Sequence, residues 1–149
     1  MTDIYDLYQD LIIDHSREPK NFGALSDRTH HAHGKNPLCG DDIKLDLKIN
    51  NNIIINLAFT GDGCAIAKAS ASLMTQALMG KNIDDALVLF TQFHEMLVNE
   101  EALINTSNLG KLEAFKGVRQ FPIRVKCATL CWHTFNAALK SQNSAVTTE

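Results

Sequence analysis

The sequence predicts an α+β fold in which a small three-stranded antiparallel sheet is covered by about five helices. Two runs that alternate apolar and polar residues, at 43–49 and 53–60, indicate paired strands, whereas other apolar residues recur at helical spacing. Glycine and proline separate these segments, and we find neither an internal repeat nor a linker. We therefore expect a single domain at 1–141, followed by a flexible polar tail at 142–149.

The N-terminal part predicts one amphipathic helix and one edge strand. Residues 3–16 place apolar side chains on a single helical face, and Pro19 ends the helix. His30, His31 and His33 then alternate with small residues, which is typical of an edge strand. Such a tract can also bind a metal, but we favour a solvated strand. The apolar positions of the helix are Ile4, Leu7, Tyr8, Leu11 and Ile12.

A β-hairpin follows. Ile43, Leu45, Leu47 and Ile49 alternate with polar residues, as in a strand with one buried face. A second apolar run occupies 53–60, and the three asparagines between the two runs favour a tight turn. The sequence Gly-Asp-Gly at 61–63 is expected to end the second strand.

Helices dominate the rest of the sequence. Residues 65–79 predict a helix that ends at Gly80, and Asn82 can cap the next one. The stripe of that next helix consists of Ile83, Leu87, Phe90 and Leu97.

The C-terminal part predicts a polar connection, a short helix or turn and one long helix. The connection occupies 99–108, and the short element at 109–118 ends near Gly117. Pro122 precedes the final helix, at about 125–141. The apolar face of this helix consists of Ala128, Trp132, Phe135 and Leu139.

Composition excludes several classes of protein. Hydrophobic residues make up 45% of the 149 residues and charged residues 21%, which argues against disorder. A net charge of -3 gives no indication of nucleic-acid binding. We find neither a secretory leader nor an apolar run long enough to cross a membrane. We therefore expect a cytoplasmic protein with reduced thiols, in which four cysteines are more typical of metal ligands or reactive groups than of disulfides.

Three of the cysteines lie where one predicted element gives way to another. Cys39 precedes a strand, Cys64 opens a helix, and Cys127 lies near the start of the last helix. Asp41 is two residues after Cys39, so both side chains can point the same way in an extended segment. Three thiolates and one carboxylate would satisfy tetrahedral zinc. The alternative is that each cysteine is only a small buried apolar residue.

The same positions predict reactive thiols. A cysteine at a helix N-terminus lies at the positive end of the helix dipole, which lowers its pKa, and we expect this for Cys64 and Cys127. Arg124 and Lys126 add positive charge beside Cys127, and Lys126 would stabilise a thiolate or persulfide.

Three sequence blocks resemble the NifU/IscU family of iron–sulfur assembly proteins. They are NPLCGD, GDGCAIAKASASLMTQALMGK and FPIRVKCATLCW, in the family's order, and the resemblance extends to about Lys140. Two features are closer to the zinc-binding SufU branch. One is the long segment between the second and third motif cysteines, with an extra helix and connection at about 83–117. The other is Lys126, which stands where the IscU branch has a histidine ligand.

The resemblance implies a site and a role. It places zinc ligands at Cys39, Asp41, Cys64 and Cys127, and makes Cys39 the acceptor of persulfide sulfur. The donor would be a pyridoxal-phosphate cysteine desulfurase of the SufS type, and a histidine of that partner would replace Cys39 on zinc. The sulfur would then pass to downstream iron–sulfur assembly or acceptor proteins. The alternative is a scaffold on which the same cysteines bind iron and build a transient [2Fe–2S] cluster.

Cys131 departs from the family pattern, because a small apolar residue is expected at its position. It follows Cys127 by one helical turn, so it could relay sulfur or form a protective disulfide. We favour a core side chain. Two further readings of the site stay open: a zinc hydrolase with Asp41 as its base, and a purely structural zinc site.

Overall fold

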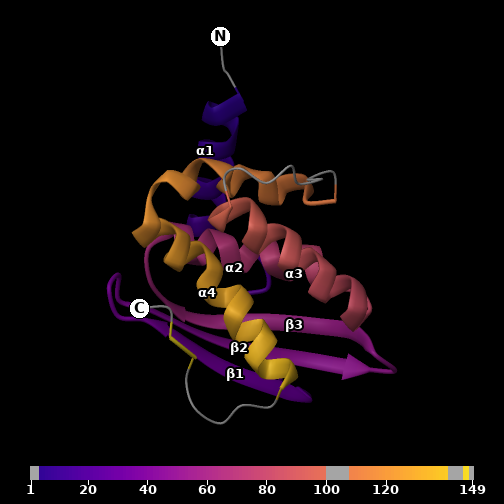
Figure 1. Ribbon diagram of the computed structural model, residues 1–149. Helices are drawn as coiled ribbons and strands as arrows, with labels where there is room; N and C mark the ends of the chain where they lie inside the picture. Colours follow the sequence, from indigo (N-terminus) through magenta and orange to yellow (C-terminus); the bar gives the residue numbers. More distant parts are fainter. Residues whose placement is uncertain (1–3, 100–107, 141–145, 148–149) are drawn as a thin grey trace.

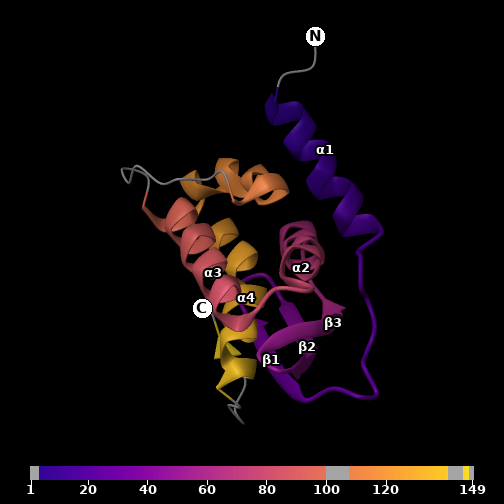
Figure 2. The same ribbon diagram turned by 90° about the vertical axis from the view of Figure 1, so that its right-hand side faces the viewer.

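The computed structural model describes residues 4–99, 108–140 and 146–147, and its helices all lie on one face of a single sheet (Figures 1 and 2). Most of the predicted polar connection at 99–108 lies outside the described residues. The same is true of the predicted flexible tail at 142–149, apart from Val146 and Thr147.

The sheet contains the three antiparallel strands that the sequence predicts. They are β1 (His30–Asn36), β2 (Asp41–Asn50) and β3 (Ile53–Asp62), with β2 in the centre. A two-residue strand, β4 (Val146–Thr147), pairs parallel with β1 and gives the order β3-β2-β1-β4. The β2–β3 turn has positive φ at Asn51 and Asn52, as a type I′ hairpin turn requires.

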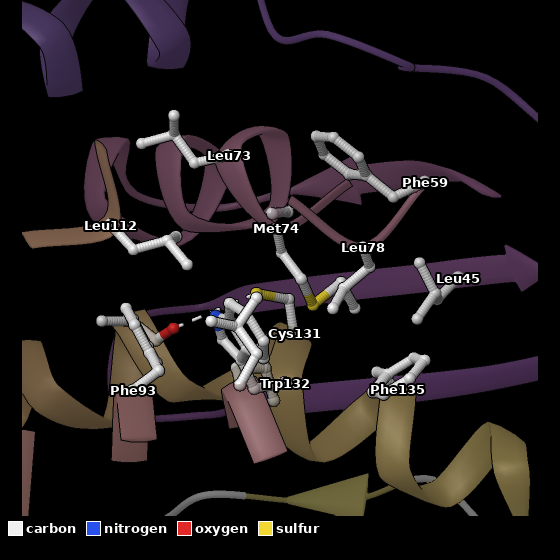
Figure 3. Packing of buried hydrophobic residues seen from close by; sticks show 14 of the residues in the cluster. Leu45, Phe59, Leu73, Met74, Leu78, Phe93, Leu112, Cys131, Trp132 and Phe135 are labelled. Carbon is white, nitrogen blue, oxygen red and sulfur yellow. Dashed lines mark hydrogen bonds between the residues drawn. The ribbon is translucent and has the colours of Figure 1, made fainter. Parts of the chain in front are cut away.

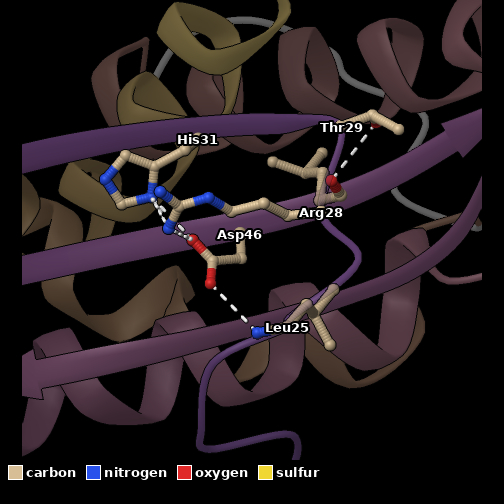
Figure 4. A network of polar contacts seen from close by, with 6 residues as sticks. Leu25, Arg28, Thr29, His31 and Asp46 are labelled. Atoms are coloured by element: carbon tan, nitrogen blue, oxygen red, sulfur yellow. Dashed lines mark hydrogen bonds and ion pairs between the residues drawn. The ribbon is translucent and has the colours of Figure 1, made fainter.

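Alternation along β2 sets which face of the sheet is buried. Ile43, Leu45 and Leu47 are fully buried. Asp46 is buried too, although its side chain points to the opposite face of the sheet, because the segment that precedes β1 covers it. Its carboxylate accepts hydrogen bonds from Leu25 N (3.0 Å) and Arg28 Nη1 (3.1 Å), and its Oδ1 lies 2.6 Å from His31 Nδ1 (Figure 4).

This network also fixes the charge of Asp46. Burial opposes ionisation, but the hydrogen bonds from His31 and Leu25 and the charge of Arg28 hold the pKa of Asp46 below its ordinary value. The ionised Asp46 carboxylate therefore joins β2 to the segment before β1, and His31 has a structural role in this network.

Helices α1 (Ile4–Arg17) and α2 (Ala65–Leu78) stack as two layers over the sheet. Helix α2 lies between α1 and the strands, which explains why small residues such as Ala69 and Ala71 are buried around it. Helix α3 (Ile83–Val98) begins at the predicted cap, where Asn82 Oδ1 accepts a hydrogen bond from Asp85 N at 2.7 Å.

The last two helical elements differ from their predicted bounds. The short element is a 3₁₀ helix, η1 (Gly110–Gln120), and helix α4 (Pro122–Leu139) begins with the proline itself. Pro122 at the first helical position loses no hydrogen bond, so the helix can start three residues earlier than predicted. Helix α4 packs across β1 and β2 and reaches the end of the sheet where β1 turns into β2.

The core lies between the sheet and the helices (Figure 3). Trp132 is fully buried and stacks on Phe93 with ring centroids 4.7 Å apart, which joins α4 to α3. Phe59 and Met74 continue the core over the strands. None of the described helices combines the length and the apolar character that crossing a membrane would need.

Candidate metal centre

The first two candidate residues lie at the connection between β1 and β2. The segment Asn36-Pro37-Leu38-Cys39 forms a turn that Cys39 N closes by donating to Asn36 O at 3.2 Å. Cys39 is half-buried, beside the exposed side chain of Leu38. Asp41 begins β2, is 2% exposed and lies opposite Asn36 in the ladder. The turn therefore presents a thiol at the surface and a carboxylate beneath it.

Cys64 reaches the same place from the junction of β3 and α2. Its backbone N–H donates to Asp41 Oδ1 at 2.8 Å, and its sulfur caps α2 by accepting from Ala67 N at 3.4 Å. Gly63 permits this approach, because a Cβ there would lie 2.6 Å from Asp41 Oδ1. The Cys64 sulfur is 3.9 Å from Asp41 Oδ2.

Cys127 completes the group from the second turn of α4. Its side chain is 2% exposed, and its sulfur donates to Cys39 Sγ at 3.0 Å. Ligand atoms of Cys39, Asp41 and Cys127 lie within 4.8 Å of one another, and among the described residues this is the one such group. Cys64 joins it through its contact with Asp41.

The structure thus brings together the four residues that the sequence singles out. Two sulfurs bound to one tetrahedral zinc lie about 3.8 Å apart, since each Zn–S bond is about 2.3 Å. The sulfurs of Cys39 and Cys127 are 3.0 Å apart, about 0.8 Å less than that, and the Cys64 sulfur is 3.9 Å from Asp41 Oδ2. Small side-chain movements would bring these donors around one ion. The donors suit zinc or iron, because both accept thiolates.

The expectation of lowered thiol pKa values is wrong for the protein without metal. Burial raises the pKa of Cys64, and it also raises that of Cys127, where Cys39, Asp41 and Cys64 act in the same direction. The helix dipole is strongest at the first turn, and Cys127 lies beyond it.

The other predicted metal candidates belong elsewhere. His31 belongs to the Asp46 network, on the sheet face opposite the helices (Figure 4). His33 is two residues further along β1, so it shares that face, and it pairs with Asp42. Cys131 is 1% exposed and its sulfur donates to Ser70 Oγ at 3.4 Å, inside the core (Figure 3).

Sequence reasoning missed Asn36. It is fully buried, and its side-chain amide donates to Asp41 Oδ2 at 3.2 Å and to Cys127 Sγ at 3.4 Å. An Asn-Pro pair before a cysteine predicts a turn, and nothing in that pattern indicates that the asparagine side chain also contacts Asp41 and Cys127.

Comparison with known proteins identifies relatives of this chain. Residues 7–128 match the NifU-like N-terminal domain. The zinc-dependent sulfurtransferase SufU of Bacillus subtilis (strain 168) is 44% identical over 126 residues, which cover 85% of this chain and 84% of that protein. The iron–sulfur cluster assembly scaffold protein IscU of Streptococcus pyogenes serotype M1 is 40% identical over 139 residues, covering 93% and 86%.

A solved structure shares the fold. The crystal structure of a protein from Fervidobacterium islandicum AW-1, described as an iron–sulfur cluster assembly scaffold for the SUF system, superposes with a TM-score of 0.83. The two sequences are 31% identical, and the match covers 92% of this chain and 99% of that one. The chain therefore belongs to the NifU-like N-terminal domain family, as its three cysteine-containing blocks predicted.

Proposed function

We propose that this protein accepts persulfide sulfur from a cysteine desulfurase at a zinc site and passes it on for iron–sulfur cluster assembly. One observation carries the proposal: three thiols and a buried carboxylate from distant parts of the chain converge, with one of the thiols on a surface turn. The similarity to a zinc-dependent sulfurtransferase supports zinc as the metal.

The proposed ligands are Cys39, Asp41, Cys64 and Cys127. Zinc bound there would hold the thiols in their deprotonated form at neutral pH. The Asp41 carboxylate is fixed by Cys64 N on one oxygen and by Asn36 on the other, so it can offer lone pairs to the metal without reorienting. Four protein ligands would leave no open position for water, which argues against a hydrolase.

Cys39 is the proposed acceptor because it combines exposure with freedom of its backbone. It is half-buried, whereas Cys127 is enclosed, and Gly40 beside it has a φ of 70°, a left-handed conformation suited to glycine. The surface turn can therefore present Cys39 to a docked protein. Helix α4 holds Cys127 in the interior.

The transfer step requires no external oxidant. The Cys39 thiolate attacks the terminal sulfur of the desulfurase persulfide and forms a new S–S bond. The S–S bond of the donor breaks, and the desulfurase cysteine leaves as a thiolate that can take a proton. The sulfane sulfur keeps its oxidation state and changes only its carrier.

A desulfurase assay tests this proposal. The cysteine desulfurase of the same organism is given cysteine and a thiol reductant, and alanine release is measured with and without the zinc-loaded protein. We expect stimulation, and expect Cys39→Ala to return the rate to that of the desulfurase alone. Cys131→Ala is the matched control, because it removes a thiol that lies inside the core. Equal stimulation by Cys39→Ala would refute the acceptor role.

The similarity to a named scaffold protein supports a second candidate, in which the same cysteines hold a nascent [2Fe–2S] cluster. Anaerobic incubation with iron and sulfide separates the two. A stable chromophore that transfers to an apo-ferredoxin, together with no effect on the desulfurase, would favour the scaffold.

A further inference from the structure

Asn36 touches each of the segments that meet at the candidate metal centre except the start of α2. Its backbone carbonyl accepts from Cys39 N at 3.2 Å, which closes the turn that carries the surface thiol. Its side-chain amide donates to Asp41 Oδ2 (3.2 Å) and to Cys127 Sγ (3.4 Å). Asp41 begins β2 and Cys127 lies in α4, so this one amide links two elements that are distant in sequence.

The chemistry of its neighbours fixes the orientation of that amide. A carboxylate oxygen is an acceptor, and so is the Cys127 sulfur, whose own proton points to Cys39, so the NH₂ group must face them. The other end of the amide, Oδ1, is then buried with no hydrogen-bond partner among the described residues. A buried acceptor without a hydrogen-bond partner lowers the stability of the fold, so this orientation of the Asn36 side chain needs a compensating interaction. The two contacts to Asp41 and Cys127 supply one.

We propose that Asn36 is a positioning residue of the metal centre. It holds the Asp41 carboxylate and the Cys127 sulfur at a fixed separation and leaves their remaining lone pairs for the cation. Its N–H···S bond also withdraws charge from the sulfur, which relieves the concentration of negative charge in a site of three thiolates and a carboxylate. The inference rests on the metal site of the proposed function and adds to it a residue that binds no metal itself.

Asn36→Leu tests the proposal, because leucine has a similar shape and no hydrogen-bond donor. We expect zinc affinity, measured by competition with a chromogenic chelator, to fall by about 10–100-fold, as is usual when an outer-shell hydrogen bond is lost. The melting temperature of the metal-free protein should fall only slightly, because the variant deprives Asp41 Oδ2 of one donor but also removes the unpaired Oδ1.

Thr134→Val is the matched control. Thr134 is also a fully buried polar residue, it lies on the same helix as Cys127, and its hydroxyl bonds to Leu130 O of that helix. This variant should bind zinc as the unchanged chain does. Asn36→Ser keeps a single donor and should be intermediate. Unchanged zinc affinity in Asn36→Leu, or a loss of affinity matched by loss of metal-free stability in both Asn36 variants, would overturn the proposal.

A measurement on the unchanged chain covers the case in which neither variant folds. With cadmium-113 in place of zinc, an N–H···S bond to a metal-bound cysteine transmits a scalar coupling from the metal to the amide proton. We expect that coupling at one side-chain proton of Asn36, and its absence would refute the role. If the unchanged chain binds neither zinc nor cadmium, the proposed function itself fails. If metal binds but Asn36 shows no effect, only this inference fails.

Discussion

Two cysteines one helical turn apart show how strongly position determines chemistry. Cys127 faces Cys39 and the amide of Asn36, whereas Cys131 lies in the core against Ser70. Complete burial raises the pKa of Cys131 to about 12, so its thiol stays protonated at neutral pH. A sulfur relay through Cys131 would need a thiolate at this position, and the surroundings oppose one.

Alkylation tests this difference between cysteines. Under native conditions at pH 8, we expect iodoacetamide to modify Cys39 in the metal-free protein and to leave Cys131 unmodified until the chain is unfolded. Peptide mass spectrometry with and without denaturant reads out each site. Rapid native labelling of Cys131 would contradict its assignment to the core.

At the residue scale, the sequence was sufficient to single out the side chains that converge but not the groups that hold them. Cys39, Asp41 and Cys64 stand at breaks between elements, and a break is visible as glycine or proline. The hydrogen bond from the Asn36 amide to Cys127 could not be predicted, because it depends on the tertiary packing of α4 against the β1–β2 turn. The predicted lowering of the thiol pKa values was wrong for the same reason, because burial depends on tertiary packing and not on the neighbouring sequence.

At the element scale, the site depends on how closely α4 approaches β1. Gly34 lies in β1 beneath Thr134 and Leu130, and a Cβ at this glycine would come within 2.0 Å of Thr134 Oγ1. No flexible side-chain end is available to relieve that overlap, because Thr134 is branched at Cβ and bonded to its own helix. The missing side chain of Gly34 thus sets the distance between the strand that carries Asn36 and the helix that carries Cys127.

Gly34→Ala should therefore destabilise the protein by about 1–3 kcal/mol through overpacking. The free energy of unfolding in urea measures the effect. Thr134→Ala should recover part of the loss in the double variant, because it removes the atom that collides. Gly117→Ala is the control, since a Cβ there meets nothing within 4 Å. Equal effects of the two glycine substitutions would show that the approach is not tight.

Element bounds were predictable where a local signal exists. Asn82 capped its helix as predicted, and the asparagine turn formed the expected hairpin. Strand β3 continues to Asp62, although Gly61 was predicted to end it. The glycine is needed within the strand, because a Cβ at Gly61 would collide with the β2 backbone. The pairing of β4 with β1 had no local signal, since it joins the two segments from opposite ends of the chain.

At the scale of the whole molecule, the hydrophobic cluster and the candidate metal centre share no residue. The hydrophobic cluster runs from the sheet through α2 and α4 to α3 and η1 and includes Trp132, Phe93 and Phe59. Of the four proposed ligands, none belongs to that cluster. The centre lies at one end of the sheet, where it joins the β1–β2 turn, the β3–α2 junction and α4. Burial of apolar surface can therefore hold the fold without metal.

Metal removal distinguishes this arrangement from a purely structural zinc site. We expect the chelator-treated protein to keep its far-UV circular dichroism spectrum, because none of the proposed ligands belongs to the hydrophobic cluster. Zinc at about 100 times its dissociation constant should then stabilise the fold by about 2.7 kcal/mol, which corresponds to a rise in melting temperature of roughly 5–10 °C. Calcium is the control ion, because it prefers oxygen ligands and should produce no shift. Loss of the helical spectrum on chelation would instead make zinc a folding requirement, and the fold would then depend on the same thiols that we assign to sulfur transfer.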